Sequence, residues 1–181
     1  KYHGGIALKK ISAPDVAAVE KGVENLKKHI ENIRRFGLPV VVAVNAFTSD
    51  TDAEIDCIRD KCSHLGVEII PAHHHAHGGE GAEDLARTVV QIAENTQSSC
   101  KLLYHEGMKL WDKAGTVAQE IYGADDIMGD KLLRGKFRRL GEEGYGHLPV
   151  CMAKTQYSLS TDPGLKGRPR GFDVQIRDVK V

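Results

Sequence analysis

The chain has 181 residues, a length that fits one domain or one domain with part of a second. Hydrophobic residues make up 41% of the chain and charged residues 28%, as is ordinary for a globular protein. Lysine plus arginine equals aspartate plus glutamate at 25 each, and this zero formal charge argues against a surface for nucleic acid or an anionic membrane.

Cysteine use and the ends of the chain indicate its compartment. Cys57, Cys62, Cys100 and Cys151 form no C-x-x-C pair, which argues against a disulfide framework and favours a reducing compartment. We expect all but Cys100 to be packing residues. No membrane-length apolar run or signal-peptide pattern occurs. Because the first residue is Lys1 and not methionine, we expect either removed residues or an internal piece of a longer chain.

The first hundred residues alternate between helix and strand patterns. Residues 12–36 are predicted to form a helix, with Ser12 and Asp15 as its N-terminal capping box and Pro14 in its first turn. Its apolar stripe comprises Val16, Val19, Val23, Leu26, Ile30 and Ile33.

Residues 38–44 form a β-branched run that predicts a strand buried on both faces. Thr51 and Glu54 predict a second capping box, before a helix that ends at Gly66. Residues 67–70 predict the next strand, and a loop at 73–81 precedes a helix that we expect to pack through Leu85, Val89, Ile92 and Ala93. This order predicts an α/β fold with a parallel, doubly wound sheet.

The pattern changes after about residue 97, so we predict an α/β portion at 1–97 and a second portion at 98–181. Spaced apolar residues predict two helices in the second portion, one through Leu110, Ala114, Val117 and Ile121 with Trp111 beside it, and a shorter one through Leu133, Phe137 and Leu140. Residues 148–153 predict a buried strand, 158–171 a loop, and the alternation at 172–176 a half-exposed strand.

Two loops leave the carboxyl ends of the first two predicted strands, which is where open α/β sheets bind ligands. Consecutive parallel strands would bring Phe47 of the first loop near the histidines of the second. Phe47 could stack on a flat ligand, although from pattern alone a gap-filling role over the helix is the favoured interpretation. Asn45 ends the first strand beside it.

The second loop contains His73, His75 and His77, which alternate and could face one side of an extended loop. Converging imidazoles can hold zinc, but no other ligand type stands at a familiar spacing, so we predict no native metal site. Gly78 and Gly79 precede a helix in a loose anion-cradle pattern that lacks the Lys-Ser/Thr ending of a Walker A loop.

Lys154, Thr155, Gln156 and Tyr157 follow the predicted strand at 148–153 and place a cation, a hydroxyl, an amide and a phenol in four positions. This combination suits an anion or a polar ligand, and an ordinary solvated strand end explains it equally well. From the residues alone, the sequence predicts a two-loop ligand cleft but no particular reaction.

Longer motifs carry a resemblance over nearly the whole chain. They are residues 1–5 (KYHGG), 29–34 (HIENIR), 36–45 (FGLPVVVAVN), 50–54 (DTDAE), 78–81 (GGEG), 121–124 (IYGA) and 148–158 (LPVCMAKTQYS). Together they resemble the formate–tetrahydrofolate ligase family, also called 10-formyltetrahydrofolate synthetases. The resemblance implies a P-loop NTPase-like sheet and a reaction in which ATP, with Mg²⁺, activates formate as formyl phosphate before transfer to N10 of tetrahydrofolate. A monovalent cation is a further candidate cofactor.

Family members hold the folate ring between two aromatic residues, which the resemblance places at Phe47 and His75. The second is often a tryptophan in relatives, and Thr48 replaces a common proline. The resemblance also places Asn45, Gly78, Gly79 and residues 154–157 among the substrate-binding residues.

The family's G-x-x-x-x-G-K-S/T loop and its formyl-phosphate arginine are expected upstream of Lys1, so we predict that the 181 residues alone are inactive. Homo-oligomers are common in the family. The cytoplasm is the expected location, with an organelle as the alternative. Three other hypotheses stay open: a non-catalytic folate- or nucleotide-binding fragment, an assembly module derived from the ligase, and a metal-dependent hydrolase built on the histidine loop.

Overall fold

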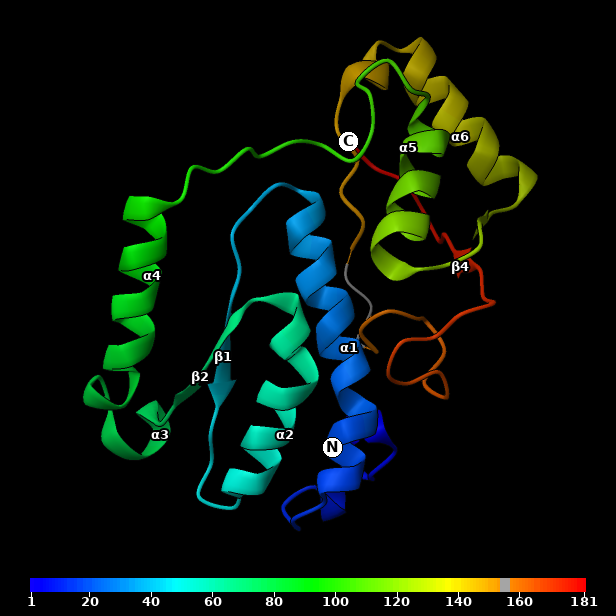
Figure 1. Cartoon of the computed structure of the whole chain (residues 1–181). Helices are drawn as coiled ribbons and strands as arrows, with labels where there is room; N and C mark the ends of the chain where they lie inside the picture. Colours follow the sequence, from blue (N-terminus) through cyan, green and yellow to red (C-terminus); the bar gives the residue numbers. More distant parts are fainter. Residues whose placement is uncertain (154–156) are drawn as a thin grey trace. The chain divides into compact units, whose positions relative to one another are not determined.

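A computed structural model describes residues 1–153 and 157–181, which form two compact units, Lys1–Cys100 and Lys101–Val181. In the first unit the elements are η1 (Tyr2–Gly4), η2 (Leu8–Lys10), α1 (Val16–Arg35), β1 (Val41–Asn45), α2 (Asp52–Cys62), η3 (Ser63–Leu65), β2 (Glu68–Ala72), α3 (His74–His77), η4 (Glu80–Ala82) and α4 (Glu83–Asn95) (Figure 1). In the second they are α5 (Leu110–Val117), η5 (a π-helix, Ala118–Tyr122), β3 (Ile127–Met128), α6 (Lys131–Glu142), η6 (Tyr145–His147) and β4 (Val174–Gln175).

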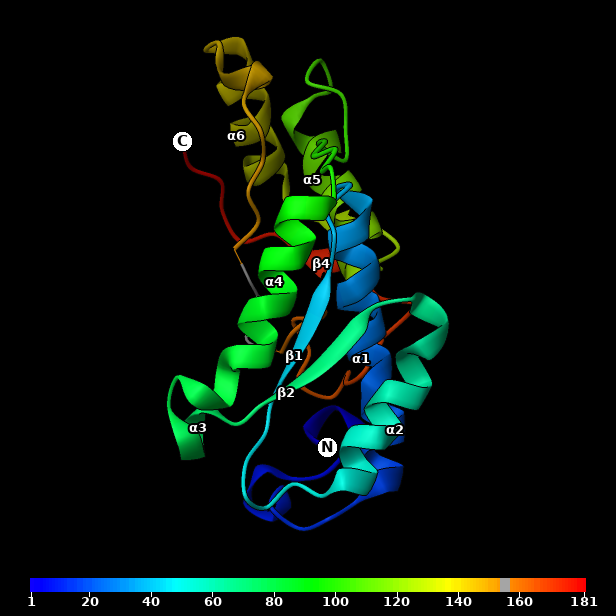
Figure 2. The same ribbon diagram turned by 60° about the vertical axis from the view of Figure 1, so that its left-hand side comes forward.

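The first unit is built on a parallel pair of strands. β1 and β2 run in register from Val41 opposite Glu68 to Asn45 opposite Ala72. Helices α1 and α2 lie on one face of this pair and α4 on the other (Figure 2). The structure thus confirms the mixed α/β class and the parallel pairing that the alternation of elements predicted.

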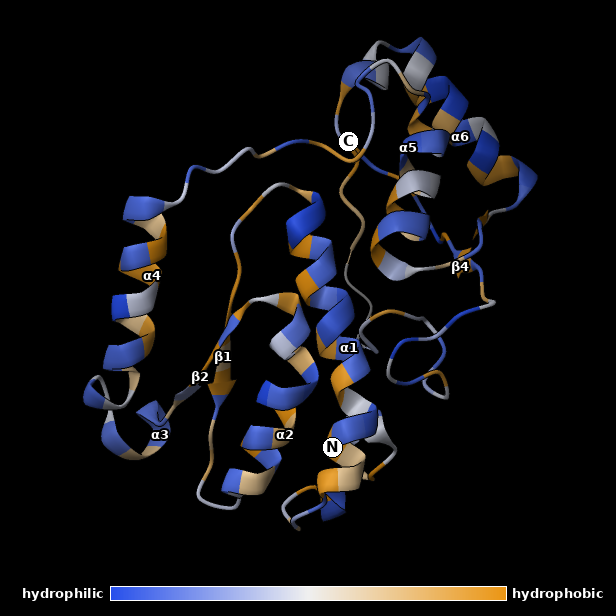
Figure 3. Ribbon diagram, viewed as in Figure 1, coloured by the Kyte–Doolittle hydropathy of each residue, from blue (hydrophilic) through white to orange (hydrophobic). Residues whose placement is uncertain are grey.

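The core of the first unit lies between the strands and the first two helices. Val23 and Ile30 of α1, Val42 of β1 and Cys62 of α2 form its buried cluster. The prediction that β1 is buried on both faces is wrong, because Ala43, which alternates with Val42, is exposed. Figure 3 shows the strands as hydrophobic and the segment around α3 as hydrophilic.

Two local predictions in this unit need correction. α1 begins at Val16, and its N-cap is Asp15, whose side chain accepts a hydrogen bond from Ala18 N at 2.8 Å. Ser12 is therefore not the cap, and Pro14 precedes the helix. On α4, Thr88 is buried, whereas the predicted core residue Val89 is 47% exposed. An inward-facing threonine is invisible to a pattern that counts only apolar residues.

The second unit packs its two predicted helices around one cluster. The core residues come from α5, η5, the loop after η5, α6 and the two short strands, and they are Leu110, Ala114, Ala118, Tyr122, Ala124, Ile127, Leu133, Phe137 and Val174. β3 pairs in parallel with β4, with Ile127 opposite Val174. β3 was not predicted, because its pattern spans only two residues.

The predicted buried strand at 148–153 is wrong. These residues form no strand, and Cys151 is exposed instead of belonging to the core. The hydroxyl of Tyr104 accepts a hydrogen bond from Val150 N at 2.7 Å and lies 3.3 Å from Val150 O. A side chain therefore contacts the backbone groups that a neighbouring strand would otherwise pair.

Candidate functional site

The loops that leave β1 and β2 meet at the carboxyl ends of the two strands. Asn45, the last residue of β1, lies opposite Ala72, and Ala46 N donates to Ala72 O at 3.1 Å. The ring centroids of Phe47 and His75 lie 5.5 Å apart with their planes at 53°. The predicted proximity of Phe47 to the histidine loop is confirmed.

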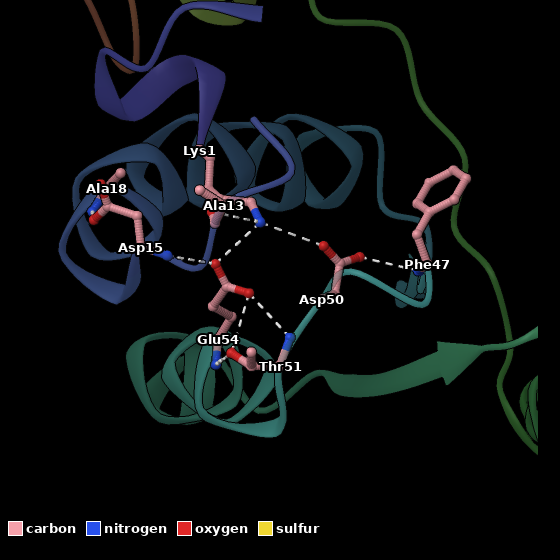
Figure 4. Close-up of polar contacts among 8 residues, drawn as sticks. All are labelled: Lys1, Ala13, Asp15, Ala18, Phe47, Asp50, Thr51 and Glu54. Carbon is pink, nitrogen blue, oxygen red and sulfur yellow. Dashed lines mark hydrogen bonds and ion pairs between the residues drawn. The ribbon is translucent and has the colours of Figure 1, made fainter. Parts of the chain in front are cut away.

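Phe47 starts a tight turn that is closed in two ways. Asp50 N donates to Phe47 O at 2.9 Å, and Phe47 N donates to the Asp50 carboxylate at 3.0 Å. Phe47 is 48% exposed, and its ring points away from that carboxylate (Figure 4). The favoured gap-filling interpretation therefore does not describe Phe47, since a ring that filled a gap would be buried.

A charged network lies beneath this turn. Lys1 Nζ lies 3.1 Å from Glu54 Oε1 and 3.4 Å from Asp50 Oδ1 (Figure 4). Only 8% of the Lys1 side chain and 4% of the Glu54 side chain are exposed. Buried charges of this kind are stable only when they are paired and hydrogen-bonded, and both conditions are met here.

Glu54 joins three segments of the unit. Its Oε1 accepts from Asp15 N at 2.9 Å, and its Oε2 accepts from Thr51 N at 3.0 Å, which completes the predicted capping box of α2. Burial alone would raise the pKa of the Glu54 carboxyl, but these hydrogen bonds together with Lys1 outweigh burial and lower the pKa to about 2. Burial likewise lowers the pKa of Lys1, and its carboxylate partners, Glu54 first, raise it above the usual 10.5.

The histidine segment forms a single helical turn, α3, and not an extended loop. The predicted alternation of His73, His75 and His77 on one side is therefore wrong. His73 N donates to Gly81 O at 2.8 Å, which closes the segment at its base. Within residues 1–153 and 157–181, no three His, Cys, Asp or Glu side chains are grouped as metal ligands.

The two predicted glycines follow this turn. Gly78 caps α3 with φ 59° and ψ −139°, a conformation that favours glycine, and its N–H donates to His74 O at 2.9 Å. That N–H is therefore already used within the turn and does not point to an anion. A Cβ on Gly79 would meet nothing within 4 Å, so this position is open.

The structure does not test the other predicted binding residues, 154–157. Lys154, Thr155 and Gln156 lie outside the residues that the structure describes. Tyr157 is half-buried and belongs to the second unit, whereas Asn45, Phe47 and His75 belong to the first. Their roles in binding stay predictions.

Lys1, Asp50 and Glu54 are the residues whose importance to this site the sequence did not indicate. Glu54 gave a signal as a capping-box residue, but not as the centre of a charged network. Lys1 stands 49 positions before Asp50, and nothing in its spacing suggests the contact.

Each unit contains a cavity among its described residues, and neither cavity is lined by the aromatic pair. One of ≈ 240 Å³ in the first unit is lined by Lys1, Asp50 and Glu54 and by apolar residues of α1, α2 and β1. Another of ≈ 650 Å³ in the second unit lies beside Trp111 and Phe137 and contains none of the predicted site residues. The aromatic pair is thus a surface feature and not the floor of either cavity.

Comparison with known proteins identifies the family. The family model described as formate–tetrahydrofolate ligase matches residues 1–181. Proteins named formate–tetrahydrofolate ligase match the whole chain at 50% identity in Granulibacter bethesdensis, 51% in Methylobacterium sp. and 46% in Ruegeria pomeroyi. The match covers 32%, 33% and 32% of these relatives, so the chain spans about a third of their length.

Proposed function

Since the chain belongs to the formate–tetrahydrofolate ligase family, we propose that it serves the ATP-dependent ligation of formate to tetrahydrofolate and that its own residues bind the folate ring. The observation that carries the proposal is the contact of Phe47 with His75 at the carboxyl ends of two parallel strands. Flat aromatic surfaces at this edge of an α/β sheet suit a planar heterocycle.

The spacing of the two rings defines how the folate ring binds. A planar ring held between two others needs about 7 Å between the outer centroids, twice the usual contact distance of carbon atoms. The Phe47 and His75 centroids are 5.5 Å apart. The pair is therefore closed, and we propose that it opens when tetrahydrofolate enters between the rings.

The proposed reaction has two steps. A formate oxygen attacks the γ-phosphorus of ATP, the bond to the leaving ADP oxygen breaks, and formyl phosphate forms. The N10 nitrogen of tetrahydrofolate then attacks the formyl carbon and loses its proton as inorganic phosphate leaves. Phosphate is a good leaving group, whereas the carboxylate oxygen of formate is a poor one, and for this reason formate is activated first. The role of the protein is to position the reactants and neutralise their charge.

The 181 residues are proposed to bind tetrahydrofolate in this reaction. In residues 1–153 and 157–181, no three His, Cys, Asp or Glu side chains are grouped as metal ligands, and Mg²⁺ and a monovalent cation are proposed from family membership alone. Gly79 and residues 154–157 are proposed to contact polar parts of the substrates. None of the helices that the structure describes has the length and apolar character to span a membrane.

Three broader features belong to the same proposal. Parallel strands with helices on both faces support a doubly wound sheet of the P-loop NTPase type in the first unit. Assembly into a homo-oligomer and a cytoplasmic location follow only from what is usual for such ligases. Size measurement in solution and cell fractionation test these two features directly.

Titration calorimetry with tetrahydrofolate polyglutamate tests the folate surface. We expect the chain to bind saturably. Phe47→Ala should bind about tenfold more weakly, since an aromatic stack is worth about 0.5–1.5 kcal/mol in addition to the contribution of its buried area. Tyr145→Ala, which removes an exposed aromatic residue of the second unit, is the matched control and should bind as the parent does. Absence of binding by a folded parent chain would refute the proposal.

A second variant tests the role of His75. Because an indole offers more stacking area than an imidazole, His75→Trp should bind tetrahydrofolate more tightly than the parent. Equal or weaker binding by a folded His75→Trp chain would show that His75 does not face the folate ring.

A further inference from the structure

We propose that Lys1 and Asp50 are positioning residues that hold the turn at Phe47 so that its ring is set in place before the flat ligand arrives. This inference rests on the proposed function for the identity of that ligand. Its basis is a continuous set of contacts that runs from Phe47 N through Asp50 and Lys1 to Glu54 (Figure 4).

Asp50 divides its two carboxylate oxygens between the turn and the network. Oδ2 accepts from Phe47 N at 3.0 Å, and Oδ1 lies 3.4 Å from Lys1 Nζ. The lysine therefore holds the carboxylate that in turn holds the backbone of Phe47. Hydrogen bonds to ionised groups are stronger than those to neutral groups. Both the position and the charge of the Asp50 carboxylate therefore stabilise the turn.

Lys1 is itself fixed. Its Nζ lies 3.1 Å from Glu54 Oε1, and it lies 3.4 Å from both Asp50 Oδ1 and Ala13 O. Three acceptors thus match the three donors of an ammonium group. Since Glu54 also accepts from the backbone at the starts of α1 and α2, the network is anchored to the two helices on one face of the strand pair.

The two walls of the aromatic pair therefore differ. Phe47 stands on a turn closed by its own backbone and by the Asp50 carboxylate. His75 stands in a one-turn helix whose residues are all exposed. When the rings separate to admit a ligand, the geometry points to movement of the His75 side and to Phe47 as the fixed wall. A wall fixed in advance saves the ordering cost that binding would otherwise include.

The test separates the shape of the turn from its charge. Asp50→Ala removes the acceptor for Phe47 N, Asp50→Asn keeps an acceptor but removes the charge, and Lys1→Met keeps the carboxylate but removes its partner. Lys1→Arg restores a cation. Lys61→Met is the matched control, because Lys61 pairs with Glu20 on the exposed surface of the same unit and contacts no residue of the turn.

Two readouts are needed for each variant. Hydrogen exchange of the Phe47 amide, followed by NMR, reports on the turn without any ligand. Calorimetry with tetrahydrofolate measures how much the fixed position of Phe47 contributes to affinity. Thermal unfolding identifies variants that fail to fold. Lys1→Met and Asp50→Ala should lose amide protection at Phe47 and bind about tenfold more weakly. Lys1→Arg should recover most of both signals, and Lys61→Met should change neither.

The outcomes distinguish this inference from the proposed function. Normal Phe47 protection and affinity within twofold of the parent in folded Lys1→Met would overturn the positioning role. If Lys1→Met does not fold, Asp50→Ala decides, because Phe47 protection equal to that of the parent in this folded variant would overturn the role of the carboxylate. If the folded parent binds no tetrahydrofolate, the proposed function fails, and the exchange experiment still decides whether the network holds the turn.

Discussion

Replacement of Glu54 by glutamine should remove an acid-dependent part of the stability of the first unit. The pKa of Glu54 is lowered from 4.5 to about 2 in the folded chain. Each pH unit between the folded and unfolded pKa is worth about 1.4 kcal/mol, so the ionised carboxylate stabilises the fold by about 3 kcal/mol. The Glu54 side chain is only 4% exposed, so solvent screening reduces this value little.

The direction of the effect follows from the lowered pKa. The unfolded chain takes up a proton at Glu54 near pH 4.5, whereas the folded chain resists until about pH 2. The stabilisation is therefore complete above about pH 5 and is lost as the pH falls from there to about 2. Glutamine has no charge to lose over this range, yet it can still occupy the capping-box position at the start of α2.

Native-state hydrogen exchange of α1 and α2 amides is the assay, because it isolates the first unit from the second. The free energy of unfolding should differ between parent and Glu54→Gln by about 3 kcal/mol at pH 6 and by little near pH 2. Glu20→Gln, which removes an exposed partner of Lys61, is the control and should show a small difference throughout. A parent-to-Glu54→Gln difference that does not change with pH would refute the reasoning.

Three further predictions concern other contacts. Thr51→Ala removes the side-chain cap of α2 and should lower the free energy of unfolding by about 1 kcal/mol in urea titration. Lys113→Met removes the buried ammonium group that donates to the carbonyls of Gly146 and Leu148 at 2.9 and 3.0 Å, and should cost about 1–3 kcal/mol by the same measurement. In Gly81→Ala the new Cβ would lie 2.5 Å from backbone atoms of the α3 cap residue, so the variant should displace that turn and weaken tetrahydrofolate binding in calorimetry.

The parts of the fold that the sequence predicted well depend on local rules. The capping box of Thr51 and Glu54 involves residues three positions apart, and it formed as expected. The contact of Phe47 with His75 follows from parallel pairing. Two parallel strands that pair in register have their carboxyl ends side by side, so the loops that follow them are neighbours. In both cases neighbours in the chain, or a single pairing rule, determine the geometry.

The predictions that failed depend on distant partners. An apolar run at 148–153 becomes a strand only if another strand pairs with it, and Tyr104 contacts Val150 instead. The histidine segment is an exception, because a local helical turn capped by Gly78 formed where the alternating histidines had suggested an extended loop. Lys1 is the clearest case at the site, because its two carboxylate partners follow it by 49 and 53 positions and no local pattern links them.

Glu54 shows why stability and binding are coupled in this unit. The same carboxylate caps α2, accepts from the N-cap residue of α1 and pairs with the lysine that holds the Phe47 turn. A change at Glu54 therefore alters the whole unit. A change at Asp50 acts mainly on the turn, because within residues 1–153 and 157–181 Asp50 bonds only to Phe47 and Lys1. For this reason Asp50 variants separate ring positioning from folding, and Glu54 variants measure the stability on which that positioning depends.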